Sequence, residues 1–211
     1  GTSLAPALWA STVWESDGML DARRRATRTR SAEFYSRYAN PTVTSFEEAV
    51  ASLEGAEASL AFASGMGALA TTVLALCSKG DHIVAQRNLY SATLAFLQGP
   101  CARFGIETTF VNPRDIDAWR AAIRPETKLL FGETLGNPGL DVLDIGTVAQ
   151  IGQDHGIPLL VDSTFTTPYL LRPFDHGAGL LYHSATKFLG GHGTTIGGVH
   201  KKAVWVDLCK H

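Results

Sequence analysis

The chain of 211 residues has few cysteines and little net charge, and these scarcities exclude several classes of protein. Its three cysteines are widely separated and form no C-x-x-C pair, which predicts a reduced, cytoplasmic protein without structural zinc. The 18 basic and 20 acidic residues leave a formal charge of −2, which provides no basic field for binding nucleic acid. With 45% hydrophobic residues, the chain is nevertheless expected to fold around a sizeable core.

Long apolar runs and a leader peptide are also lacking. The apolar stretch at residues 68–77 is short and interrupted by threonines, so we expect no membrane span and no membrane partner. Residues 1–9 show no basic segment before an apolar run, so we predict no signal peptide. Glycine, by contrast, is abundant, with 21 residues gathered in clusters.

From about residue 44 the sequence alternates between helical periodicity and short apolar runs. This alternation is typical of βαβ units on a parallel sheet and predicts an α/β fold. We expect strands at 82–85, 107–111, 128–132, 158–162 and 180–183, and helices at 65–78, 92–104 and 145–155. A capping box at residues 44–47 predicts the start of a helix that ends at Glu54, with Gly55 beyond its end.

The first 43 residues do not follow this alternation. We predict that residues 1–43 form an arm and residues 44–211 form one domain. Residues 21–30 contain five arginines, which we interpret as a solvated arm or helix face.

The strongest chemical signal is the segment Tyr182–Lys187, an apolar strand that ends in S-x-T-K before a glycine-rich turn. A strand end delivers its lysine to the edge of a parallel sheet, where ligands of open α/β folds bind. Ser184 and Thr186 lie two residues apart, so an extended chain would point both hydroxyls toward one phosphate. A lone lysine after a strand is more often a surface residue, so this segment needs support from others.

Two further elements provide that support. The buried strand 159–161 ends in Asp162, and a buried carboxylate needs a cationic partner, such as a protonated pyridine nitrogen. An N-cap or an internal ion pair would also explain Asp162. Ser64, Gly65 and Met66 open an apolar helix, whose free N–H groups suit an anion. Together the three elements offer a phosphate site, an amine that can capture an aldehyde and an acid for a ring nitrogen. These match the phosphate, the aldehyde and the ring nitrogen of pyridoxal phosphate.

Six short motifs carry a resemblance to a known family, and they are Tyr35–Thr42, Ser64–Met66, Leu89–Tyr90, Glu133–Pro138, Val161–Asp162 and Ser184–Lys187. The chain resembles the Cys/Met-metabolism pyridoxal-phosphate enzymes, which include cystathionine γ-synthase, methionine γ-lyase and O-acetylhomoserine sulfhydrylase. The resemblance implies a fold-type I, aspartate-aminotransferase-like domain with a mostly parallel sheet between helices, preceded by an N-terminal arm. It also implies pyridoxal 5'-phosphate as cofactor and a place in methionine and cysteine metabolism.

The same resemblance implies roles for individual residues. Lys187 would bind the cofactor covalently and then move protons on the substrate. Asp162 would keep the ring nitrogen protonated, and Tyr90 would stack on the ring near the leaving group. The remaining cofactor contacts would come from Gly65, Met66, Ser184 and Thr186 at the phosphate, Asn137 and Glu133 near the O3′ side, and Thr164 near the ring.

Two residues of the arm receive a role in the neighbouring subunit. Tyr35 and Arg37 lie two apart before Pro41, so we predict an extended segment with both side chains on one side. By the resemblance they would reach the partner's cofactor phosphate, so a homodimer would complete the site, with dimers pairing into a tetramer. Without the resemblance, an exposed aromatic and a solvated arginine would be the simpler interpretation.

Residues 133–145 and 187–194 look most like the O-acetylhomoserine sulfhydrylase branch, which predicts γ-replacement on an O-acyl homoserine by sulfide or a thiol. Dedicated methionine γ-lyases carry a cysteine two residues after the stacking tyrosine, where this chain has Ala92. Residues 1–30 and 91–105 instead resemble γ-lyase-like sequences, so γ-elimination at a C–S bond is the alternative.

The family's C-terminal domain carries an arginine for the substrate carboxylate, and the 211 residues stop shortly after Lys187. We therefore expect that domain to be absent here and the chain to be a fragment of a longer protein. A non-catalytic cofactor-binding or dimerisation module is a second hypothesis. A nucleotide-binding dehydrogenase is a weak third one, because no G-x-G-x-x-G lies between an early strand and a helix.

Overall fold

The computed structural model describes residues 5–28 and 33–202, and the chain divides into two compact units, residues 1–50 and 51–211. The first unit contains helix α1 (Met19–Thr27) and most of helix α2 (Pro41–Glu54). An antiparallel β-bridge between Val13 and Tyr35 connects the segments before and after α1. The arginine-rich segment forms α1, in which Arg25 pairs with Asp21 one turn away over 2.7 Å.

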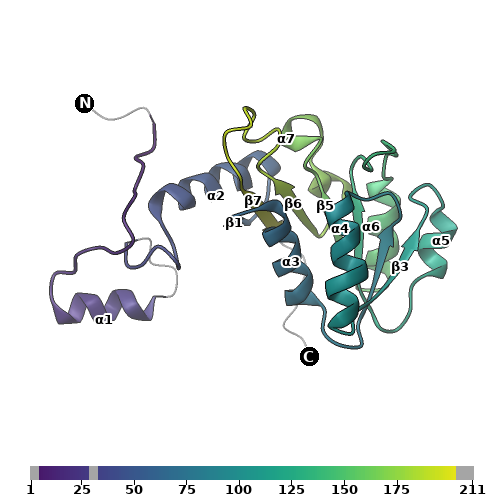
Figure 1. Ribbon diagram of the computed structural model, residues 1–211, viewed down its shortest axis with the longest axis horizontal. Coiled ribbons are helices and arrows are strands. Elements are labelled where there is room, and N and C mark those ends of the chain that lie inside the picture. Colours follow the sequence, from purple (N-terminus) through teal and green to yellow (C-terminus); the bar gives the residue numbers. More distant parts are fainter. Residues whose placement is uncertain (1–4, 29–32, 203–211) are drawn as a thin grey trace. The chain divides into compact units, whose positions relative to one another are not determined.

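The second unit is built around a mixed sheet of seven strands, labelled in Figure 1. The strands are β1 (Ala58–Phe62), β2 (His82–Gln86), β3 (Glu107–Val111), β4 (Thr127–Glu133), β5 (Leu159–Asp162), β6 (Leu180–Ser184) and β7 (Gly198–Lys202). Their order is β1-β7-β6-β5-β4-β2-β3. The strands from β6 to β3 are parallel, and β7 runs antiparallel to both of its neighbours, β1 and β6. This confirms the expected α/β fold with a mostly parallel sheet.

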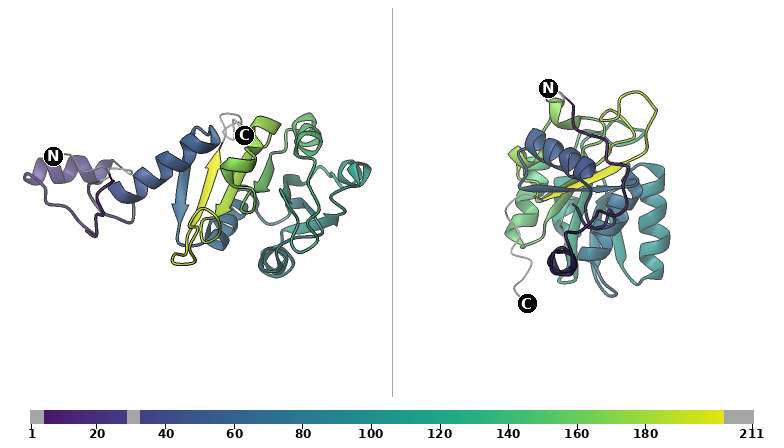
Figure 2. Two further views of the ribbon diagram at one scale, coloured as in Figure 1. Left: turned by 90° about the horizontal axis from the view of Figure 1, so that it is seen from above. Right: turned by 90° about the vertical axis from the view of Figure 1, so that its left-hand side faces the viewer.

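Helices cover both faces of this sheet, as the view from above shows (Figure 2, left). They are α3 (Gly65–Leu76), α4 (Ser91–Phe96), α5 (Ile116–Ala121), α6 (Ile145–Asp154) and α7 (Thr167–Leu170), with a 3-10 turn η2 (Pro173–His176). α4 continues as a π-helix, η1 (Leu97–Cys101), which contains Pro100. Proline has no N–H to donate to the preceding turn, and a widened turn accommodates this loss.

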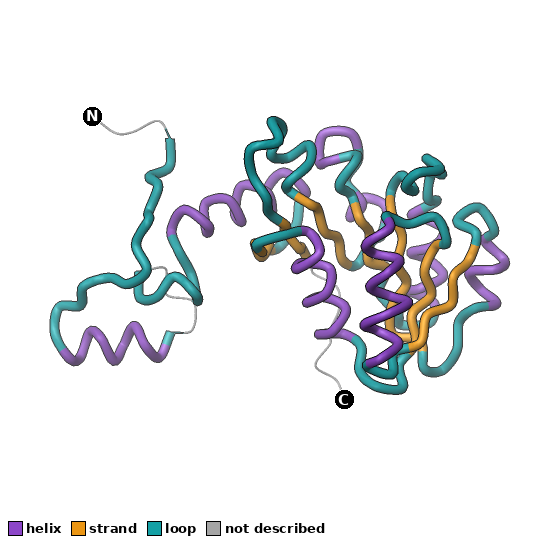
Figure 3. Tube along the Cα trace, in the orientation of Figure 1, coloured by secondary structure: helices purple, strands orange, loops and turns teal. Residues whose placement is uncertain are grey.

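Two apolar clusters hold these layers together, with the strands (orange in Figure 3) between the helices. One cluster packs Leu69 and Val73 of α3 and Leu97 of η1 against the sheet. The other packs Trp119 of α5 and Val148 of α6 against the opposite face. Continuous apolar runs in the central strands follow from burial on both faces.

The five strands and three helices expected from the sequence are confirmed, whereas β1, β7, α1, α5, α7 and η2 were not predicted. The predicted start of α2 is wrong, because the helix begins at Pro41 rather than after Thr44. The side chain of Asn40 accepts a hydrogen bond from Thr42 N at 2.9 Å and so caps an earlier turn. The helix ends at Glu54 as predicted, and Gly55 takes a φ of 66°, the left-handed conformation of a C-terminal cap.

Candidate active site

The carboxyl ends of three neighbouring parallel strands meet at one edge of the sheet. β4 ends at Glu133, β5 ends at Asp162, and Tyr182 lies near the end of β6. The strand register pairs Glu133 with Asp162 and Asp162 with Tyr182, so these residues form a row across the sheet. Because ligands of open α/β sheets bind at this edge, the row marks the place of a candidate site.

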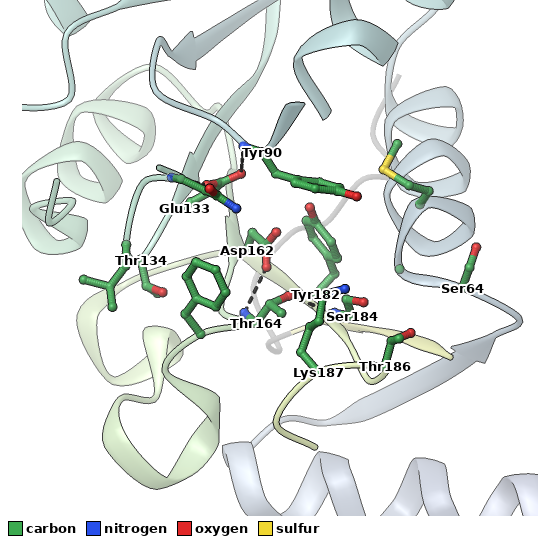
Figure 4. Close-up of a pocket in the computed structure, with 15 residues that line it drawn as sticks. Ser64, Tyr90, Glu133, Thr134, Asp162, Thr164, Tyr182, Ser184, Thr186 and Lys187 are labelled. Carbon is green, nitrogen blue, oxygen red and sulfur yellow. Dashed lines mark hydrogen bonds between the residues drawn. The ribbon is translucent and has the colours of Figure 1, made fainter. Parts of the chain in front are cut away.

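A pocket with a cavity of about 220 Å³ lies over this row (Figure 4). Its walls come from the start of α3, the residue preceding α4, and the loops that follow β4, β5 and β6. All the predicted cofactor-binding residues of the second unit line it, and they are Gly65, Met66, Tyr90, Glu133, Asn137, Asp162, Thr164, Ser184, Thr186 and Lys187.

Asp162 lies at the floor of the pocket with 8% of its surface exposed. Its Oδ1 accepts a hydrogen bond from Thr164 N at 2.9 Å. Burial raises the pKa of the Asp162 carboxyl, while hydrogen bonds from Thr164 and Tyr182 lower it. A cation beside the carboxylate would offset the cost of its burial, and a protonated ring nitrogen is such a cation.

Thr164 connects the ends of two strands. Its Oγ1 accepts a hydrogen bond from Ser184 N at 2.8 Å, so the loop after β5 is attached to the end of β6. Since Thr164 N also donates to Asp162, one residue fixes the acid and the serine relative to each other. Thr164 thus links the ends of β5 and β6 on this side of the pocket through two hydrogen bonds.

The start of α3 forms the far wall of the pocket. Ser64 caps the helix, its Oγ accepting from Gly67 N at 3.0 Å and its carbonyl oxygen from Ala68 N at 3.0 Å. Within residues 5–28 and 33–202, no hydrogen bond from the N–H groups of Gly65 and Met66 is formed, and both residues line the pocket. Free N–H groups at a helix start bind a phosphate well.

Gly65 is required by the close packing of α3 against β6. A Cβ atom at this position would lie 2.7 Å from the Cβ and 2.9 Å from the Cα of Ser184. Only a glycine allows the helix start and the strand end to approach so closely. The two candidate phosphate-binding segments therefore lie directly beside each other.

The chain turns immediately after Ser184, so the prediction that residues 184–186 are extended is wrong. Lys187 N donates to the carbonyl oxygen of Ser184 at 3.1 Å, which closes the turn. Thr186 Oγ1 accepts from Gly197 N at 3.1 Å and lies near the Gly197 carbonyl oxygen at 3.3 Å. Ser184, Thr186 and Lys187 nevertheless all line the same pocket. The turn, and not the alternation of side chains along a strand, brings them together.

Glu133 is almost fully buried, with 4% of its surface exposed. Its Oε1 accepts from Tyr90 N at 2.7 Å and its Oε2 from Asn137 N at 3.1 Å. Burial and the nearby Asp162 carboxylate raise the pKa of Glu133 to about 8, although both N–H groups act in the opposite direction. The carboxyl group thus connects Tyr90, which by the resemblance would stack on the cofactor ring, with Asn137, which would lie near the cofactor's O3′ side.

Tyr35 and Arg37 belong to the first unit, and their predicted extended segment is wrong. Tyr38 N donates to the Tyr35 carbonyl oxygen at 2.9 Å, which makes residues 35–38 a turn. The guanidinium of Arg37 lies 5.1 Å from the ring centroids of both Tyr35 and Tyr38, within the range of a cation–π contact. The arginine and the two aromatic rings therefore form one cluster.

Sequence reasoning missed several residues of the pocket wall, among them Tyr182, Thr134 and Phe165. For Tyr182 a signal existed, because it precedes Ser184 by two positions on one strand and so shares its face. Thr134 and Phe165 lie one residue beyond predicted site residues, in loops whose course the sequence did not reveal.

The residues of the pocket fit pyridoxal phosphate. The start of α3 at Gly65 and Met66 offers N–H groups to a phosphate, Asp162 offers a buried carboxylate to a ring nitrogen, and Lys187 supplies the amine that would react with an aldehyde. Among the described residues, no cluster of three or more His, Cys, Asp or Glu could hold a metal ion. No helix in the described ranges is long and apolar enough to span a membrane.

Comparison with known proteins identifies relatives of two activities. The chain is 39% identical over 198 residues to the L-methionine gamma-lyase of Treponema denticola, covering 93% of this chain and 49% of that protein. It is 43% identical over 179 residues to the O-succinylhomoserine sulfhydrylase of Pseudomonas aeruginosa, covering 85% of this chain and 44% of that protein. The chain thus spans about half the length of these curated relatives.

A solved structure of a putative O-acetylhomoserine (thiol)-lyase from Campylobacter jejuni superposes with a TM-score of 0.90 at 31% identity. The match covers 95% of this chain and 50% of that protein, which contains a pyridoxyl-lysine phosphate. The sequence model of the family described as "Cys/Met metabolism PLP-dependent enzyme" matches residues 2–209. The chain therefore belongs to the Cys/Met-metabolism family of pyridoxal-phosphate-dependent enzymes.

Proposed function

We propose that this protein catalyses γ-replacement, in which sulfide or a thiol displaces the acyloxy group of O-acetyl- or O-succinylhomoserine. A C–S bond forms at the γ-carbon and the C–O bond breaks. The leaving carboxylate takes the bonding electron pair, and the thiol proton passes to a base. The exchange is redox-neutral and needs no other reactant.

The observation that carries this proposal is Ala92, two positions after Tyr90 at the start of α4. By the resemblance described above, dedicated methionine γ-lyases have a cysteine at this place. The segment Glu133–Pro138, which forms part of the pocket wall, resembles the sulfhydrylase branch. The similarity to O-succinylhomoserine sulfhydrylase supports the same choice.

Pyridoxal phosphate, when bound, withdraws electrons from the α-carbon of the substrate. In our proposal, the amine of Lys187 binds the cofactor and moves protons between substrate carbons. Asp162 keeps the ring nitrogen protonated, and the ring of Tyr90 stacks on the cofactor. Glu133 holds Tyr90 in place through the backbone N–H.

The phosphate would be held at the opposite end of the pocket. There the N–H groups of Gly65 and Met66 would donate to it, together with the hydroxyls of Ser184 and Thr186. Asn137 would lie toward the O3′ side and Thr164 beside the ring. Together these residues would hold the cofactor in the pocket that Lys187 also lines.

Product analysis distinguishes the candidate activities. With O-acetylhomoserine and sulfide, γ-replacement yields homocysteine and acetate without ammonia. With methionine alone, γ-elimination yields methanethiol, ammonia and 2-oxobutyrate. Homocysteine formation at least tenfold faster than 2-oxobutyrate release would support the proposal, and the reverse ratio would reject it.

γ-Elimination is the second candidate, and it is favoured by the similarity to L-methionine gamma-lyases from three organisms at 39–44% identity. Both reactions need the same groups at the cofactor. In γ-replacement a thiol adds after the γ-substituent has left. In γ-elimination water completes the reaction and releases ammonia and a 2-oxo acid.

We further propose that Tyr35 and Arg37 complete the pocket of a partner subunit, with residues 1–43 as the arm and residues 44–211 as the cofactor domain. Support comes from the family resemblance and from the cation–π cluster that presents Arg37. Mixing Arg37→Ala with Lys187→Ala protein tests this proposal. Mixed dimers would contain one intact site, so activity should rise above that of either variant alone, and no rise would count against a shared site.

We propose a cytoplasmic location as well. Cys77 and Cys101 are free, buried thiols, and burial raises the pKa of the Cys77 thiol to about 12 and that of Cys101 to about 11. Unpaired cysteines of this kind fit a reducing compartment. Fractionation of cells with antibody detection would test the location.

A further inference from the structure

Tyr182 lies in the pocket beside the acid that the cofactor needs. It is the register partner of Asp162 on the adjacent parallel strand, so the two residues are direct neighbours across β5 and β6. Figure 4 shows the two side chains next to each other, with the ring of Tyr182 directed toward Tyr90 and the Asp162 carboxylate bonded to Thr164. Only 3% of the Tyr182 surface is exposed, although it lines the pocket.

The phenol ring of Tyr182 is held from behind by Phe131. The two rings are stacked, with centroids 6.3 Å apart and an angle of 20° between their planes. Phe131 is itself buried in strand β4. This packing restricts the ring of Tyr182, so the position of its hydroxyl is determined by the core rather than by solvent.

The hydroxyl of Tyr182 and the carboxyl of Asp162 interact, because each group shifts the pKa of the other. Burial raises the pKa of Tyr182 well above its usual value, and the Asp162 carboxylate raises it further. The phenol therefore keeps its proton at neutral pH. The Tyr182 hydroxyl lowers the pKa of the Asp162 carboxyl, as the hydrogen bonds from Thr164 do, and so favours its charged form.

We propose that Tyr182 is a positioning residue, whose hydroxyl keeps Asp162 ionised and oriented to pair with the ring nitrogen of bound pyridoxal phosphate. Thr164 N binds Asp162 Oδ1 at 2.9 Å, so the carboxylate is held by the tyrosine and the threonine together. The proposal depends on the cofactor and is independent of whether the reaction is replacement or elimination.

The variant Tyr182→Phe tests the proposal because it removes the hydroxyl and keeps the ring that packs on Phe131. Cofactor affinity is measured by titration with pyridoxal phosphate and, in parallel, with an analogue in which a C–H group replaces the ring nitrogen. We expect about tenfold weaker binding of pyridoxal phosphate, the size expected for a hydrogen bond to a charged group. Binding of the analogue should change less than twofold, because it offers Asp162 no nitrogen.

The matched control is Tyr169→Phe, which removes a hydroxyl from a side chain that is 91% exposed. It should leave both affinities unchanged. Equal losses for the two cofactors in Tyr182→Phe would show that Tyr182 acts by packing alone and would overturn the proposal. Unchanged affinities would overturn it as well.

A second replacement keeps the test available if Tyr182→Phe does not fold. 3-Fluorotyrosine at position 182 preserves the ring and makes the hydroxyl more acidic, hence a stronger donor. We expect tighter binding of pyridoxal phosphate and an unchanged affinity for the analogue. Unchanged or weaker binding of pyridoxal phosphate would contradict the proposal.

Discussion

The backbone N–H of Tyr90 donates to Oε1 of Glu133 over 2.7 Å. The second oxygen of the same carboxyl group accepts from Asn137 N over 3.1 Å. One buried side chain thus determines where two loops lie on either side of the pocket. Glu133 therefore shapes the candidate site through the backbone of its neighbours.

We expect Glu133→Gln to break one of these two hydrogen bonds and keep the other. An amide has a single acceptor oxygen, so its NH2 group would face one of the two N–H donors and that hydrogen bond would be lost. The affinity for pyridoxal phosphate should fall roughly tenfold, measured by titration. The exposed Glu126→Gln is the control, and equal affinities for the two variants would refute a positioning role for Glu133.

The stability of the cofactor-free protein should depend on the protonation of Glu133. The pKa of its carboxyl is raised from the ordinary 4.5 to about 8, so the folded protein holds a proton that the unfolded chain releases. The free energy of unfolding should therefore fall as the pH rises from about 4.5 to about 8, by an amount on the order of 5 kcal/mol.

Urea unfolding at several pH values in this window measures the effect, with Glu133→Gln as the reference. Burial lowers the pKa of His82 and His200, which gives a slope of the opposite sign in both proteins. The difference between the proteins isolates the contribution of Glu133. A difference that does not change with pH would contradict the raised pKa.

Lys187→Ala should abolish covalent attachment of the cofactor. The unaltered protein mixed with pyridoxal phosphate should show a visible absorbance that borohydride bleaches, and a peptide containing residue 187 should carry the reduced adduct. The control Lys79→Ala removes an exposed lysine outside the pocket and should behave like the unaltered protein. An adduct on any other lysine, with Lys187 unmodified, would exclude the assigned role.

Gly65→Ala should destabilise the protein by about 1–3 kcal/mol, the usual cost of overpacking. The added Cβ would lie 2.7 Å from the Cβ of Ser184, so α3 and β6 would have to separate. Gly146→Ala, in the first turn of α6, meets only one atom at 3.8 Å and should be neutral or stabilising. Chemical denaturation of both variants provides the comparison, and equal stabilities would argue against close packing at Gly65.

A buried hydrogen bond joins α2 to the strand that leads to Lys187. His183 Nε2 donates to Glu54 Oε1 over 2.6 Å, and both side chains are fully buried. Glu54→Ala should cost about 3–5 kcal/mol of unfolding free energy, since it leaves a buried polar group without its partner. Glu57→Ala, at an exposed position, should change stability by less than about 0.5 kcal/mol. Comparable losses in thermal unfolding would contradict this assignment.

Much of the fold was predictable because the central strands are continuously apolar and end in polar residues. The run Leu159–Val161 before Asp162 shows both properties. β7 lacks them, since Gly198–Lys202 contains histidine and two lysines, and its place depends on pairing with β1 and β6. Pairing partners of this kind are distant in sequence and leave no local pattern.

Those site residues that belong to a sequence motif could be predicted. The backbone course of loops that depends on tertiary contacts could not. Asp162 and Lys187 were found from strand ends, whereas the turn at residues 35–38 was not. Ser36 N donates to Thr12 O at 2.9 Å, and Ser36 Oγ donates to Ser11 O at 2.5 Å. These bonds bend the chain where the proline at position 41 had suggested extension.

The antiparallel strand β7 joins segments that lie far apart in the chain. It inserts between β1, which leads into α3, and β6, which leads into Lys187, and it pairs Ala58 with Lys202. Closing so long a loop is costly before the contacts form. The part of the sheet between β1 and β6 is therefore completed only when residues 198–202 pair with residues 58–62.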